Sequence, residues 1–142
     1  MESTRGIGAN WKFHHIGAIV RDMDEAVRYY DSLEMFTLQP EFGGGEGRAR
    51  LRLAEIGPNR IELISPSQGP PIFRDFLDAK GEGIHHIAFT VDSLDSEIAK
   101  LTARGIPVIT SMRRPDGSGI AFFDLRKIGG VVIELMQLQK PA

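Results

Sequence analysis

The apolar positions of this chain follow two periods, one typical of strands and the other typical of helices. Runs rich in apolar and β-branched residues predict strands over 13–20, 36–38, 48–56, 60–65, 84–91, 107–109, 120–123 and 131–137. Apolar residues at helical spacing predict helices over about 25–33, 72–80 and 95–104. The order strand, helix, strand, strand, strand therefore occurs twice, with one further helix between the two sets, and the expected fold class is α+β.

Local signals mark where these helices begin, end and face. Asp22 or Asp24 is the expected N-cap of the first helix, and Gly105 is the expected stop of the last. The first helix should turn Ala26, Val27, Tyr30 and Leu33 inward, and the apolar residues of the other two are Ile72, Phe73, Phe76 and Leu77, then Ile98, Ala99 and Leu101. Four glycines in the five positions 43–47 predict a flexible loop over 41–47. It is not a phosphate-binding loop, because it lacks the lysine and the strand–loop–helix context of one.

The two sets of elements repeat one pattern at a nearly constant distance. The paired positions are His14 and His85, His15 and His86, and Glu62 and Glu134. Both histidine pairs are separated by 71 residues and the two glutamates by 72. Such self-similarity indicates a duplicated module. We expect one domain over 1–142, made of two βαβββ modules at about 12–66 and 83–138 that form a curved, mostly antiparallel sheet.

Each of the two glutamates stands in a strand between apolar residues. Side chains alternate across a strand, so the apolar neighbours of Glu62 and Glu134 should face the core and the carboxylates the opposite, concave side. A carboxylate buried there is costly unless it is paired or bound to a cation. A single glutamate of this kind is usually a surface charge at a sheet edge, whereas two at equivalent positions favour cation binding.

One histidine of each pair is expected to join these glutamates. His15 shares a strand face with Gly17, and His86 shares one with Ala88, and both small residues leave room for a ligand. Two imidazoles and two carboxylates suit a divalent ion such as Zn²⁺, Co²⁺, Fe²⁺, Mn²⁺ or Ni²⁺. The expected metal ligands are therefore His15, Glu62, His86 and Glu134.

The neighbouring histidines, His14 and His85, should point the other way. A lone His-His on a strand is more often a satisfied structural pair, and we expect these two to be structural or to support the ligands.

The four expected ligands would not fill the coordination shell of the ion. In an octahedral shell, four protein ligands leave two positions open. Two carboxylates roughly neutralise the ion, so the site would be able to stabilise an enolate without holding it irreversibly.

Composition narrows the class of protein. The 142 residues carry a net charge of −2 with scattered Lys and Arg, which gives no reason to expect a nucleic-acid partner. The chain has no cysteine, so it has no disulfide and no thiolate ligand. No apolar run approaches the ~18 residues of a membrane span. We expect a cytoplasmic protein that has no membrane partner.

Several stretches resemble the vicinal oxygen chelate (glyoxalase/bleomycin resistance/dioxygenase) superfamily, and within it the methylmalonyl-CoA epimerases. They are residues 13–17, 60–66, 81–88 and 129–135. The resemblance implies paired βαβββ modules around a metal-containing cavity, metal ligands at the four positions given above, and usually a homodimer. It also implies a small-molecule substrate, in this branch an acyl-CoA thioester whose oxygens chelate the metal.

The sequence departs from the epimerase pattern in two places. The third-strand slot that carries an acid/base glutamate in many bacterial epimerases aligns with Leu51, or with Arg50 after a one-residue shift. The family's His-Pro after the seventh strand is replaced by 124–126 (Asp-Leu-Arg). Arg50 and Arg52 are the candidate groups for binding an anionic substrate, since arginine pairs bidentately with carboxylate or phosphate, and the alternative is that they form a solvated strand face.

The leading functional hypothesis is a divalent-metal-dependent epimerase or isomerase that acts through a metal-stabilised enolate. The catalytic base would be Glu62 or Glu134, displaced from the metal, or a metal-bound hydroxide. A glyoxalase I-type lyase acting on a thiol–aldehyde hemithioacetal would use the same ligands. A non-catalytic, small-molecule-binding protein of the resistance type would need no metal. An extradiol dioxygenase fits less well, because it uses only two histidines and one carboxylate.

Overall fold

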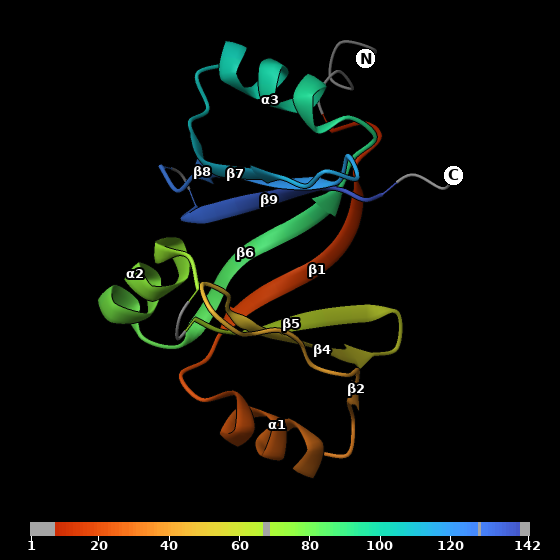
Figure 1. Cartoon of the computed structure of the whole chain (residues 1–142), viewed down its shortest axis with the longest axis vertical. Helices are drawn as coiled ribbons and strands as arrows, with labels where there is room; N and C mark the ends of the chain where they lie inside the picture. The colour runs from red at the N-terminus through yellow and green to blue at the C-terminus, as the bar shows by residue number, and fades with distance from the viewer. Residues whose placement is uncertain (1–7, 67–68, 128, 140–142) are drawn as a thin grey trace. The chain divides into compact units, whose positions relative to one another are not determined.

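The computed structural model describes residues 8–66, 69–127 and 129–139 of the chain (Figure 1). In chain order its elements are β1 (Lys12–Ile19), α1 (Met23–Ser32), β2 (Thr37–Leu38), β3 (Phe42–Gly43), β4 (Arg50–Ile56), β5 (Asn59–Ser65), α2 (Pro71–Lys80), β6 (Gly83–Thr90), α3 (Leu94–Ala103), β7 (Val108–Arg113), β8 (Gly119–Leu125) and β9 (Val131–Gln137). The α+β class and the duplicated βαβββ order are confirmed.

The described residues group into two compact units. The first unit is 15–85, and the second unit combines 8–14 with 86–139. The division falls inside β1, between His14 and His15, and inside β6, between His85 and His86. A single domain with module boundaries at 12–66 and 83–138 stays a prediction.

In the first unit, the strands lie in the order β2-β4-β5-β1, and β3 also pairs with β4. β4 and β5 are antiparallel and β5 runs parallel to β1. A two-residue turn joins β4 to β5, since Ile56 is opposite Asn59, and its first residue Gly57 has φ 56°. A positive φ at this position is a feature of type II′ hairpin turns, which fix the register of both strands.

Helix α1 lies over one face of this sheet (Figure 1), and its apolar stripe packs against Leu63 of β5. Of the two predicted candidates, Asp22 is the N-cap, and its Oδ1 accepts a hydrogen bond of 3.0 Å from the Glu25 N–H. Met23 is fully buried against Leu63, whereas Leu33, predicted to face inward, is 41% exposed. The stripe therefore begins one turn earlier than predicted, because the helix starts at Met23 and Leu33 is already its C-cap.

The second unit repeats this construction. Its strands lie in the order β6-β9-β8-β7, with β6 parallel to β9 and the other two pairs antiparallel. Helix α3 lies over this sheet (Figure 1), and its Leu94 and Leu101 belong to one buried core cluster with Phe123 and Leu135 of the strands. Ser93 caps α3, and Gly105 follows it with φ 77°, as predicted for a helix stop.

Within the second unit, Trp11 joins the segment before β1 to helix α3. Trp11 Nε1 donates a hydrogen bond of 2.7 Å to Glu97 Oε1 on α3, and the Trp11 ring lies 5.7 Å from that of Phe89. Lys100 pairs with the same carboxylate at 3.1 Å. Glu97 is 8% exposed, and these two partners offset the cost of burying its charge.

The glycine-rich segment is more ordered than the sequence predicts. Phe42–Gly43 forms β3, which pairs with Leu51 and Arg50 of β4, so a loop over all of 41–47 is wrong. Gly43 has φ 72°, and a Cβ there would lie 2.5 Å from the Ala49 carbonyl oxygen. Glycine is needed at this position for both reasons. β7 is likewise longer than the predicted 107–109, reaching Arg113.

Helix α2 closes the first unit over the start of β6. Phe73 is buried, and the rings of Phe73 and Phe76 stand edge-on to the His85 ring at 5.5 and 5.1 Å. Gly81 ends the helix with φ 81°, as its place in the sequence predicts. None of the helices in the described ranges combines the length and the apolar character needed to cross a bilayer.

Candidate metal centre

In the first unit, β1 and β5 bring one histidine to one glutamate. Gly17 of β1 is the register partner of Glu62 of β5, and His15 lies on the same face two residues earlier. His15 Nε2 and Glu62 Oε1 are 3.5 Å apart. The His15 side chain is only 1% exposed and that of Glu62 13%, so the first pair is nearly excluded from water.

In the second unit, β6 and β9 build the same arrangement. Ala88 is the register partner of Glu134, and His86 again lies two residues before the small residue. His86 Nε2 and Glu134 Oε1 are 3.2 Å apart, with side-chain exposures of 1% and 7%. Each half of the repeat thus joins its predicted histidine to its predicted glutamate through a parallel strand pair.

Within each pair, the two donor atoms are spaced as two ligands of one metal ion would be. Ligands about 2.0–2.2 Å from a metal lie roughly 3.0–3.5 Å from one another at octahedral to tetrahedral angles. A charge-assisted N–H···O⁻ hydrogen bond is shorter, about 2.7–2.9 Å. Imidazole nitrogen and carboxylate oxygen are also the donor types that suit the divalent ions considered above. The residues of each pair therefore fit a divalent cation.

Apolar side chains stand opposite both glutamates. Leu53 of β4 is the register partner of Glu62, and Phe122 of β8 is the partner of Glu134. The Phe122 ring also stands edge-on to the His86 ring at a centroid distance of 5.2 Å. These neighbours limit the movement of the donor groups and strengthen their electrostatic interactions by excluding water.

The third-strand slot carries no acid in the structure. Leu51 and Leu53 both lie on the Glu62 face of β4, because their partners are Ile64 and Glu62. The departure at 124–126 has a local structural role: Asp124 accepts hydrogen bonds of 2.9 and 2.8 Å from the Arg126 guanidinium. These bonds lower the pKa of Asp124 to about 2.

Arg50 and Arg52 lie on the other face of β4, opposite Ser65 and Leu63. Arg50 donates hydrogen bonds of 2.9 and 2.8 Å to Glu41 and one of 2.8 Å to Asp24. These hydrogen bonds hold the pKa of the Asp24 and Glu41 carboxyls below the usual range. The same bonds raise the pKa of the Arg50 guanidinium. Arg52 Nε is buried and has no hydrogen-bond partner among the described residues. Substrate binding by this pair stays a prediction, and it would take place away from Glu62.

Glu55 lies on the same face of the sheet as Glu62, and it was not among the predicted site residues. Glu55 of β4 is the register partner of Arg60 of β5, and Arg60 Nε lies 3.6 Å from Glu55 Oε2. The Gln39 side-chain amide donates to the other oxygen, Glu55 Oε1. Counting outward from the two-residue turn at 57–58 would have placed Glu55 opposite Arg60.

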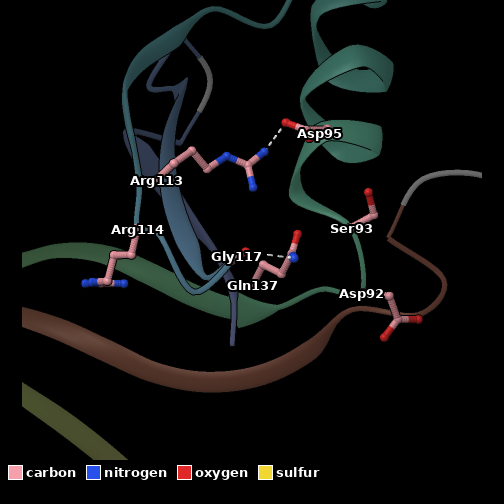
Figure 2. A pocket seen from close by; sticks show the side chains of 7 residues that line it. All are labelled: Asp92, Ser93, Asp95, Arg113, Arg114, Gly117 and Gln137. Atoms are coloured by element: carbon pink, nitrogen blue, oxygen red, sulfur yellow. Dashed lines mark hydrogen bonds and ion pairs between the residues drawn. The ribbon is translucent and has the colours of Figure 1, made fainter. Parts of the chain in front are cut away.

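The hollow at the start of α3 is a separate feature (Figure 2). It has a volume of about 430 Å³ and is lined by Asp92, Ser93, Asp95, Arg113, Arg114, Gly117 and Gln137. Its polar groups already bind one another: Arg113 pairs with Asp95, and Gln137 accepts from the Leu94 N–H and donates to the Gly117 carbonyl. None of the four predicted metal ligands lines it.

Comparison with known proteins relates most of the chain to one family. The family model described as Glyoxalase/Bleomycin resistance protein/Dioxygenase superfamily matches residues 14–123. The uncharacterized protein YqjC of Bacillus subtilis is 27% identical over 128 residues, which cover 89% of this chain and 91% of YqjC.

Two solved structures extend the likeness to three dimensions. A hypothetical protein from Bacillus halodurans superposes with a TM-score of 0.76 at 28% identity, covering 94% of this chain and 98% of that chain. A variant of the methylmalonyl-CoA epimerase of Streptomyces coelicolor, in complex with 2-nitronate-propionyl-CoA, superposes with a TM-score of 0.75 at 26% identity. That likeness covers 91% of this chain and 98% of the epimerase.

Proposed function

Because the chain belongs to the Glyoxalase/Bleomycin resistance protein/Dioxygenase superfamily, we propose that it is a divalent-metal-dependent epimerase or isomerase of acyl thioesters. The observation that carries the proposal is the repeated buried pair, His15 with Glu62 and His86 with Glu134. A single pair of this kind is compatible with a structural ion pair. Its recurrence at the same register in a duplicated module favours a common chemical task.

The proposal assigns all four side chains to one divalent cation, Co²⁺, Zn²⁺, Fe²⁺, Mn²⁺ or Ni²⁺. Two imidazoles and two carboxylates supply a neutralising donor set with two positions left for substrate oxygens in an octahedral shell. Such an ion, when bound, would act as a Lewis acid toward the substrate's carbonyl oxygens and so acidify the hydrogen between them.

The proton itself has to be moved by groups of the chain. Glu62 and Glu134 are proposed for this task, because the third-strand slot holds Leu51 and the position opposite Glu62 holds Leu53, and neither is an acid. One carboxylate oxygen accepts the proton from the substrate carbon, and an acid returns a proton to the opposite face of that carbon. Leu53 and Phe122, the register partners of the two glutamates, place apolar side chains beside the carboxylates and limit the access of water to them.

The substrate class follows from the epimerase likeness. The Streptomyces coelicolor enzyme is seen with an acyl-CoA analogue, and we propose an acyl-CoA thioester with an acidic α-hydrogen for this protein as well. A homodimer, as is usual in the family, belongs to the same proposal. Sedimentation velocity measures it directly.

The proposal is tested by metal analysis followed by hydrogen exchange. We expect one divalent ion per chain in the purified protein, and incorporation of deuterium at the α-carbon of methylmalonyl-CoA in D₂O. E62Q and E134Q should each lower metal affinity by at least about tenfold, since even partners that only orient a ligand contribute tenfold or more. R28Q, a change on the exposed side of α1, is the matched control.

Two outcomes would contradict the proposal in different ways. Failure to take up any of the five ions would remove the metal site itself. Uptake without α-exchange, together with turnover of methylglyoxal and glutathione, would replace the isomerase with the lyase that uses the same donors.

A further inference from the structure

One row of register partners differs between the two sheets by an exchange of residues. In the first unit this row joins Gly43 of β3, Arg50 of β4 and Ser65 of β5. In the second unit it joins Arg113 of β7, Gly119 of β8 and Gln137 of β9. The rows correspond, because each contains the first residue of β4 or β8 and the last residue of β5 or β9. The arginine and the glycine have therefore changed strands between the two copies of the module.

Both arginines nevertheless bind the same position of the helix that lies over their sheet. Arg50 donates a hydrogen bond of 2.8 Å to Asp24, and Arg113 Nη2 donates to Asp95 Oδ1. Asp24 and Asp95 are each the second residue of their helix, α1 and α3, and they are 71 residues apart, as the histidine pairs are. The duplicated module thus keeps one arginine–aspartate bond in each unit.

Gly119 makes room for the side chain of Arg113. A Cβ at position 119 would lie 2.8 Å from Arg113 Cδ and 2.7 Å from the Met112 carbonyl oxygen. Contacts this short would force the arginine to move, so a glycine is needed here for space. With glycine at 119, the Arg113 guanidinium extends toward Asp95 of α3 (Figure 2).

The two arginines differ in their second partner. Arg50 also binds Glu41 bidentately, with hydrogen bonds of 2.9 Å from Nε and 2.8 Å from Nη2. Among the residues that the structure describes, Arg113 binds one carboxylate, that of Asp95, and no acid takes the place of Glu41. The hollow of about 430 Å³ lies beside Arg113 instead (Figure 2). An arginine that holds two carboxylates in one copy of the module holds a single one in the other.

The other polar groups of the hollow leave the arginines as its anion-binding groups. The first N–H groups of α3 are already bound, at 2.8 Å to Gln137 Oε1 and at 3.2 Å to Ser93 Oγ. Arg114 also lines the hollow, and its side chain donates one long hydrogen bond of 3.4 Å to Ser118. The walls carry two arginines and two aspartates, so a small anion meets no net negative charge there.

We propose that this hollow binds the carboxylate of a small organic acid, held by Arg113 as Glu41 is held by Arg50. Arg113 keeps its bond to Asp95, just as Arg50 keeps its bond to Asp24, so no existing bond has to break. A planar guanidinium binds a carboxylate bidentately. The volume falls in the range of small-molecule sites, about 300–1,000 Å³. None of the predicted metal ligands lines the hollow, and the inference does not depend on the proposed function.

Titration of the ¹⁵N-labelled protein with succinate, followed by NMR, tests the site. Succinate should shift the Arg113 Nε–H signal to saturation, whereas succinamide, its neutral counterpart, should not. R113Q should weaken succinate binding by at least about tenfold, as expected for loss of a charge-assisted hydrogen bond. R113K keeps the charge but not the bidentate geometry, so its loss should be smaller. R104Q, at the exposed C-cap of α3, is the matched control and should stay within about twofold of the wild type.

The outcomes bear on the hollow separately from the metal centre. The inference is overturned if the wild type shows no saturable succinate binding, if folded R113Q binds succinate as well as the wild type, or if only inorganic phosphate binds. E62Q removes a predicted metal ligand of the first unit and should leave succinate affinity within about twofold; its loss there would mean that succinate binds at the metal and would also overturn the inference. Circular dichroism shows whether each variant is folded, and R113K supplies the comparison if R113Q is not.

Discussion

Arg50 and Arg60 are both strand arginines in the first unit, and strand alternation decides what each can do. Arg50 faces the α1 side and is fixed by Glu41 and Asp24. Arg60 faces the side of Glu62, and its Nε lies 3.6 Å from Glu55 Oε2. From the sequence, Arg50 and Arg52 are the candidate anion-binding groups, because arginine pairs bidentately with carboxylate or phosphate. In the structure, the register places Arg60, and neither Arg50 nor Arg52, on the face of the predicted ligand Glu62.

At the same scale, Asp124 provides a pH-dependent test of local electrostatics. Hydrogen bonds from Arg126 depress its pKa to about 2 from an ordinary value of 3.8. A depressed carboxyl pKa stabilises the fold above the unfolded-state value, and this stability is lost as pH falls through the folded-state value. D124N should therefore be less stable than the wild type at pH 7, by at most about 1 kcal/mol for so exposed a pair.

The difference should shrink as pH falls from about 4 to about 2, where the wild-type carboxyl also becomes neutral. Urea denaturation of both proteins across this range measures it. High salt is the control, since screening should reduce the difference at pH 7. A gap that grows on acidification would show that Asp124 stabilises the fold by some route other than its charge.

At the scale of elements, strand β3 depends on one backbone conformation. Gly43 and Gly45 both have positive φ, 72° and 80°, but only Gly43 has an atom in the path of a Cβ, the Ala49 carbonyl oxygen at 2.5 Å. G43A should lower the free energy of unfolding by about 1–3 kcal/mol, from strain and displacement of β3. G45A carries only the φ penalty, about 1 kcal/mol.

Thermal unfolding of the two variants against the wild type gives the comparison. If G43A and G45A lose the same unfolding free energy, then displacing β3 costs no stability and its pairing with β4 contributes none. A larger loss in G43A, with loss of protection at the Gly44 amide in hydrogen exchange, is the expected result, because Gly44 N–H bonds to the Ala49 carbonyl.

The elements also show how much of the fold and of the candidate site can be predicted from the sequence. Alternation around Glu62 and Glu134, the Asp22 cap and the glycine stops were enough to predict the modules and both His–Glu pairs. Burial of Met23 was missed because it stands between two aspartates, and β3 because its glycines resemble a loop. The Glu55–Arg60 contact depends on the hairpin register, which Gly57 sets and which periodicity alone does not contain.

At the scale of the whole molecule, each compact unit carries its own optical reporter. Trp11, the only tryptophan of the chain, belongs to the second unit, and both tyrosines, Tyr29 and Tyr30, belong to the first. If the proposed ion is shared by all four ligands, its binding stabilises both units. The gain is RT ln(1 + [M]/Kd), about 2.7 kcal/mol at a hundredfold excess of free metal over Kd.

Removal of metal by a chelator should therefore lower the midpoints of both the Trp fluorescence and the Tyr absorbance transitions. Adding metal back should restore both. A shift confined to the tryptophan signal would mean that His86 and Glu134 hold the ion without the first pair, and a shift confined to tyrosine would mean the reverse. E62Q, which removes a ligand of the first unit, is the companion measurement.

The duplicated pairing of one imidazole with one carboxylate also bears on stereochemistry. An epimerase has to accept two substrates that are mirror images at one carbon, and it has to run equally well from either. A protein whose two halves descend from one module offers each mirror form a carboxylate of the same kind, set beside the same kind of ring. Handedness of the substrate would then select which half takes the proton and which returns it.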